Sequence, residues 1–190
     1  MNELVLTDNP KPIISSFRWL LAILSLAGFA VSVVVYVASF KGLTLDRMGI
    51  WVFVLHVGIF LLLITMYGIE SSAIRDRTFF WDGFKRGKPS WALPLIQFLG
   101  VFFFAHFVLF FLISHGASPK IVDGRFVLDS HGQIKKLLTE AEFHSLKGYE
   151  LRIFATGWMS FYSTTAIYWW FPAMKKRSSL IGIFEKKPNE

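Results

Sequence analysis

The chain has 190 residues, is 54% hydrophobic with 21 Phe, and carries a formal net charge of +7, a balance typical of a polytopic membrane protein of one domain, 1–190. Because it contains no Cys, disulfides, thiolate metal sites and cysteine-held iron–sulfur clusters are excluded. The basic residues gather at the ends of apolar runs, so membrane topology explains the charge and no nucleic-acid partner is expected.

Long apolar runs predict four membrane spans, at about 18–40, 49–69, 91–114 and 151–172. As helices that rise about 1.5 Å per residue, all four are long enough to cross roughly 30 Å of hydrocarbon. In the first run, Ser25, Gly28 and Ser32 recur at helical spacing and would let a neighbouring helix approach closely. The sequence therefore predicts an all-α membrane protein, built as a four-helix transmembrane bundle.

The distribution of basic residues predicts the orientation of these spans. With a cytoplasmic N-terminus, more than half of the Lys and Arg fall on the inner side, so the positive-inside rule favours both termini in the cytoplasm of a bacterial inner membrane. The inner loop, 70–90, is then expected to rest against lipid headgroups through four aromatic residues: Phe79, Phe80, Trp81 and Phe84. A basic stop at 175–177 follows the last span, and the first run is expected to be a retained anchor.

The outer segment between the third and fourth spans, 121–150, has the pattern of a folded extramembrane unit. Residues 124–129 and 133–138 are strand-like and flank a turn with Gly132, which predicts a small β-hairpin. Thr139 and Glu142 then match a capping box at the start of a helix. Helical sequence continues to Pro172, about 50 Å at the usual rise per residue, so the last helix is expected to protrude from the outer surface.

Four polar residues of the spans fall at a similar expected depth, roughly 10 to 13 Å below the outer surface by helix rise: Ser32, His56, His106 and Ser160. Three interpretations of this polar layer stay open. The first is a hydrogen-bond cluster that fixes the register of the helices, the usual arrangement for intramembrane polar groups. The second is ligation of a b-type haem by His56 and His106. The third is a proton or quinone site at a titrating histidine.

The sequence contains no pattern that predicts catalysis. It has no GxSxG, P-loop or Gly-rich dinucleotide motif, no paired carboxylates in a span and no histidine spacing typical of a metal site, so no catalytic or metal residue is assigned. We expect a non-enzymatic membrane protein that binds or restrains a membrane or periplasmic protein partner through the outer segment. The candidate contact residues are Phe126, Leu128, His131 and Phe143. The alternative is a haem b or quinone-binding anchor subunit that uses the two intramembrane histidines.

The overall layout also resembles a known family. Four spans with both ends inside, a compact length and a basic stop after Phe171-Pro172 are similar to the immunity proteins that protect bacteria from pore-forming colicins of the A type. This resemblance covers the topology of most of the chain and implies a role in immunity or defence. Residues 124–162 also resemble stretches of small bacterial inner-membrane proteins of no known function. Neither resemblance assigns a site residue.

Overall fold

The computed structural model describes residues 12–69 and 88–171. The helices are α1 (Pro12–Ser39), α2 (Leu45–Met48), α3 (Ile50–Ile69), α6 (Ala92–Ser114) and α7 (Glu140–Trp170). The strands are β1 (Ser118–Val122), β2 (Arg125–Ser130) and β3 (Gln133–Leu137). The aromatic residues predicted to anchor the inner loop and the basic stop at 175–177 lie outside the described residues.

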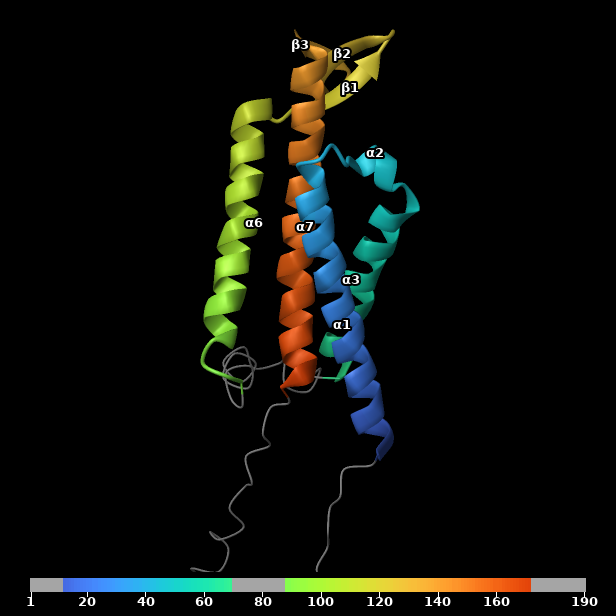
Figure 1. The fold of residues 1–190 in the computed structure, drawn as a ribbon, viewed down its shortest axis with the longest axis vertical. Helices are drawn as coiled ribbons and strands as arrows, with labels where there is room; N and C mark the ends of the chain where they lie inside the picture. The colour runs from blue at the N-terminus through green and yellow to red at the C-terminus, as the bar shows by residue number, and fades with distance from the viewer. Residues whose placement is uncertain (1–11, 70–87, 172–190) are drawn as a thin grey trace, which may run out of the picture.

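Helix α7 is the central element of the fold, and α1, α3 and α6 lie around it (Figure 1). Along the chain, α1 and α6 run towards the sheet, whereas α3 and α7 run away from it (Figure 1). The start of α1, the start of α6 and the end of α7 therefore meet at one end of the bundle, which we call the base. The opposite end, where the sheet packs on the first turns of α7, is called the sheet end.

Three helices are long and apolar enough to cross a membrane: Ser16–Ser39, Ile50–Gly68 and Ala92–Ser114. No more than 28% of the apolar window of any of them is buried inside the protein. Exposing their remaining apolar surface to water would be unfavourable, and the hydrocarbon of a bilayer removes that exposure. These helices agree with the first three predicted spans and are those of a membrane protein.

Helix α7 contains the fourth predicted span, but it is less apolar than the other three and is not among the candidate spans found in the described residues. Its interior position explains this composition, because small and hydroxyl residues line its buried surface, among them Thr156, Gly157, Ser163 and Thr165. The hydroxyls are satisfied within the helix itself. The Oγ1 atom of Thr156, for example, donates to the Arg152 carbonyl at 2.8 Å.

Helices α1, α3 and α7 meet at Tyr162 of α7. Its buried hydroxyl donates to the carbonyl of Leu55 in α3 at 2.9 Å. A Cβ atom added at Gly28 of α1 would overlap the tyrosine ring, and one added at Gly58 of α3 would overlap its hydroxyl. Ser25 and Ser32, which flank Gly28, are fully buried. This confirms the expectation that the small residues of the first span allow a close helix approach.

The sheet has three antiparallel strands in the order β1-β2-β3, in place of the predicted two-stranded hairpin. Each connection is a two-residue turn with positive φ at both positions, Asp123-Gly124 (50° and 72°) and His131-Gly132 (52° and 85°). Such angles are typical of type I′ turns, which match the twist of antiparallel strands. The prediction missed β1 although Asp-Gly is a strong turn signal, because Pro119 and Lys120 interrupt its apolar pattern.

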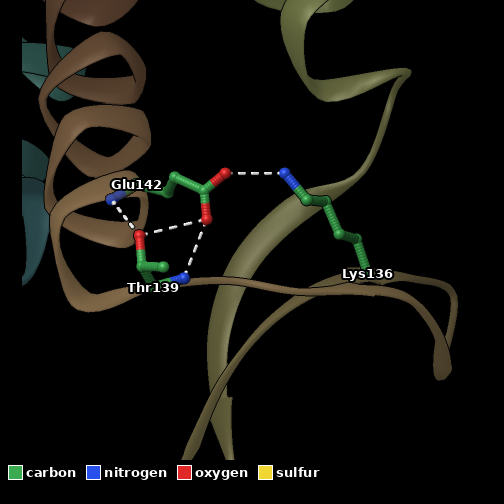
Figure 2. Close-up of polar contacts among 3 residues, drawn as sticks. All are labelled: Lys136, Thr139 and Glu142. Carbon is green, nitrogen blue, oxygen red and sulfur yellow. Dashed lines mark hydrogen bonds and ion pairs between the residues drawn. The ribbon is translucent and has the colours of Figure 1, made fainter.

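The start of α7 has the predicted capping box (Figure 2). The backbone N–H of Glu142 donates to the Thr139 hydroxyl at 3.2 Å, and the backbone N–H of Thr139 donates to the Glu142 carboxylate at 2.8 Å. Lys136 of β3 adds an ion pair to the same carboxylate at 2.6 Å. The box therefore satisfies early backbone donors of the helix and also ties the end of the sheet to it.

Candidate functional site

The sheet and the first turns of α7, residues 118–150, form one folded body that we call the sheet unit. The ring of Phe126 in β2 lies 4.7 Å from the ring of Phe143 in α7. Leu128 packs with Leu146 and Ala117 in a small hydrophobic cluster. Since Leu128 and Phe143 are only 5% and 7% exposed, they hold the sheet against the helix. This corrects their assignment as partner contacts, because a buried side chain cannot meet a partner.

The exposed surface of the sheet unit offers other apolar side chains. All five residues of β3 are exposed, and Ile134 and Leu137 keep 54% and 60% of their surface accessible. Ile121 of β1 is 60% exposed, and His131 is exposed in the turn before β3. The sequence reasoning missed the three aliphatic residues. The adjacent lysines at 135 and 136 were the available signal, because such charges are typical of an uncovered edge strand.

Ion pairs and hydrogen bonds order the charged groups of the sheet unit. Lys120 lies 2.6 Å from Asp129 and lowers the pKa of that carboxyl. The contact with Lys136, followed by the bonds from Thr139, lowers the pKa of Glu142 from 4.5 to about 2. Both carboxylates therefore stay ionised well into the acid range.

A second charged group lies where the sheet unit joins the bundle. Lys147 of α7 pairs with Asp46 of α2 at 3.3 Å and with Glu150 at 3.2 Å. Burial raises the pKa of Glu150, and the neighbouring ammonium of Lys147 opposes that rise. Lys147 thus links the short α2 helix to the part of α7 where the sheet unit joins the bundle.

The two intramembrane histidines sit in different surroundings. His56 of α3 places its Nδ1 atom 3.0 Å from the Val52 carbonyl, and its ring packs edge-on against Phe154 and Trp158 of α7. His106 of α6 places Nδ1 3.0 Å from the Phe102 carbonyl. Its Nε2 atom lies 3.2 Å from the hydroxyl of Tyr36 in α1. With Nδ1–H donating to a carbonyl, Nε2 accepts the proton of the tyrosine hydroxyl.

The predicted polar layer is not a mutually bonded cluster. Ser32 donates to the Gly28 carbonyl at 2.7 Å, and the Ser160 carbonyl accepts bonds from the hydroxyls of Ser163 and Thr164. No hydrogen bond within residues 12–69 and 88–171 joins any two of the four layer residues. The side chains of Ser32, His56 and His106 instead contact carbonyls one turn earlier in the same helix, and His106 also contacts Tyr36, which is outside the layer.

Few side chains of the described residues are placed to bind a haem or a metal ion. A bis-histidine haem needs a ring nitrogen from both His56 and His106 on one iron, and His106 would have to give up its contact with Tyr36. In the described part of the chain, no group of three or more His, Asp or Glu could hold a metal ion.

Comparison of the chain with protein-family models, with curated proteins and with solved structures found no match.

Two cations close the base of the bundle. Arg18 of α1 donates to the Trp169 carbonyl at 3.3 Å, and Lys88 contacts the Phe171 carbonyl. Trp19 and Trp170 pack edge-to-face at 4.9 Å beside them. Positive charge at a helix C-terminus is favourable because the last carbonyls lack helical donors. The base is therefore a structural junction of α1, α6 and α7.

Proposed function

We propose that the chain is a non-enzymatic, multi-pass protein of a bacterial inner membrane that binds or restrains a partner protein through the sheet unit. One observation carries the proposal. The sheet unit extends beyond the ends of α1 and α6 (Figure 1) and presents exposed aliphatic residues on an edge strand. A role in immunity or defence agrees with this arrangement, since such a protein acts by contact and not by chemistry.

The proposal includes α7 as a fourth span, which makes the chain a four-helix transmembrane bundle. Its residues 151–170 run alongside α1 and α6, two of the candidate spans (Figure 1). A helix surrounded by other helices needs small residues and internally bonded hydroxyls more than it needs apolar surface. With four antiparallel spans, the two chain ends share one side of the membrane. The positive-inside rule makes that side cytoplasmic and exposes the sheet unit on the outer side.

Because the natural chain has no Cys, single-cysteine variants can test this topology directly. Gln133→Cys lies in the exposed edge strand, and Ser90→Cys lies in an exposed position at the base. A membrane-impermeant thiol reagent should label Gln133→Cys in intact cells and Ser90→Cys only after permeabilisation. Labelling of both positions from the same side would contradict the proposed topology.

Partner binding is tested with substitutions that leave the core of the sheet unit intact. Ile134→Glu with Leu137→Glu places two charges on exposed positions of β3. In cells challenged with a pore-forming toxin, the wild-type chain should protect, and this double variant should not. Glu140→Gln, at a carboxylate 74% exposed in the same unit, is the control and should protect like wild type. Membrane levels of each variant are measured in parallel.

A photo-reactive residue can then identify the contact. Placed at Ile134, it should give a discrete crosslinked product in native membranes. Placed at Ile64, an exposed residue of a candidate span, it should label lipid. Identical products at both positions, or none at Ile134, would refute partner binding through β3.

A further inference from the structure

Arg152 of α7 occupies an unusual position at the sheet end. Its guanidinium carbon lies 4.4 Å from the ring centre of Phe40 and 4.1 Å from the ring centre of Tyr149. The side chain also lies close to the α7 backbone, because a Cβ atom added at Gly148 would be 3.1 Å from its Nη2 atom. The cation is thus held over two aromatic rings and is half-buried.

This cation has no counter-charge in the described part of the chain. The nearby Glu150 is paired with Lys147 at 3.2 Å. Neither an ion pair nor a hydrogen bond links the Arg152 guanidinium to any residue within 12–69 and 88–171, and its Nε atom is buried without a partner. A guanidinium partly removed from water is costly without an acceptor, so the site is suited to an anion from outside the protein.

The level of this cation in the membrane indicates the chemistry of that anion. Phe40 directly follows α1, at the point where a candidate span ends. Lipid phosphates lie at this level, and interfacial aromatic rings and arginine side chains are typical of it. Stacking fixes the plane of the guanidinium, and its two Nη groups, which unlike Nε are not buried, are left available for two parallel bonds to phosphate oxygens.

We infer that Arg152 binds the phosphate group of a membrane phospholipid between α1 and α7, in the leaflet at the sheet end. This binding anchors α7 to the membrane surface at the point where the sheet unit joins the bundle. The inference rests on the membrane placement of α1 and not on the binding of a protein partner.

The experiment uses the purified full-length chain in detergent micelles and measures bound phosphatidylglycerol by native mass spectrometry. Charge-assisted hydrogen bonds predict that Arg152→Gln weakens retention of the tightest lipid by at least about tenfold. Arg152→Lys should be intermediate because it keeps the charge and loses the fork. Tyr149→Leu keeps the arginine but removes one ring, and should weaken binding by a few-fold. Lys41→Gln changes an exposed cation just beyond Phe40 and should leave the affinity unchanged.

Two further probes separate the possible sources of phosphate. Diacylglycerol, which lacks the phosphate, should not occupy the site, and millimolar inorganic phosphate should not displace the lipid. Equal retention by wild type and a folded Arg152→Gln variant would overturn the inference. So would binding of inorganic phosphate with no lipid retained. Toxin protection by Arg152→Gln is measured separately, so that failure of lipid binding and failure of partner binding can be told apart.

Discussion

The contact between Tyr162 of α7 and Gly58 of α3 predicts that one substitution will cancel the destabilising effect of another. At Gly58, the nearest atom to an added Cβ is the Tyr162 hydroxyl, and the next is ring carbon Cζ at 3.6 Å. Gly58→Ala in the natural chain must therefore displace the hydroxyl. In a Tyr162→Phe background the same methyl group meets only ordinary van der Waals contact. The second substitution should thus remove the cost of the first.

The magnitudes follow from the contacts of Tyr162. Tyr162→Phe loses one interhelical hydrogen bond, about 0.6 kcal/mol on average within membranes. The Leu55 carbonyl keeps its acceptor role within α3, so no polar group is orphaned. Overpacking by Gly58→Ala costs about 1–3 kcal/mol, less the roughly 0.5–1 kcal/mol gained when Ala replaces Gly in a helix. In the Phe background only the gain is left, so Gly58→Ala should be neutral or stabilising there.

A double-mutant cycle in bicelles, with unfolding followed by steric trapping, measures these free energies. Gly28→Ala is the control, because its Cβ overlaps carbon atoms of the ring that Phe also carries. Its cost should be nearly the same in both backgrounds. If Gly58→Ala proves as destabilising beside Phe as beside Tyr, the proposed close contact at the hydroxyl is refuted.

Three other predictions can be tested on the purified chain. Because the folded-state pKa of Glu142 is about 2 against a usual 4.5, its contribution to stability is present above pH 4.5 and is lost as the pH falls towards 2. Hydrogen-exchange protection at the start of α7, relative to the intrinsic exchange rate at each pH, should fall over that window in wild type and much less in Glu142→Gln. Gly124→Ala, at φ 72°, should cost about 1–2 kcal/mol in thermal unfolding, whereas Gly100→Ala, with open space around it, should be neutral or stabilising. If His56 and His106 hold haem, a reduced-minus-oxidised spectrum will show a Soret band that His56→Ala abolishes, and a colourless preparation would remove that alternative.

The sheet unit shows where local sequence signals were sufficient and where they were not. The capping box at Thr139 and Glu142 was predictable because its two partners are three residues apart. The burial of Leu128 was not predictable, since it depends on which face of β2 lies against α7. Strand β1 was predictable in principle from the Asp123-Gly124 turn and was missed.

For the polar residues of the bundle, too, the sequence predicted some features and not others. The depths of His56 and His106 along their helices follow from counting residues, but their partners do not. One imidazole packs against Trp158, and the other meets the hydroxyl of Tyr36, seventy positions earlier in the chain. A similar depth does not decide which face of each helix turns towards which neighbour.

The sequence by itself determined three apolar helices suited to a bilayer and the start of α7, because hydrophobic run length and helix capping depend on neighbouring residues. Only the tertiary structure decided that α7 lies at the centre of the fold, that Tyr162 joins three helices and that Arg152 lies between two rings. Those features depend on the rotation and closest approach of helices far apart in sequence, which are fixed by packing between helices and not by the pattern within any one of them.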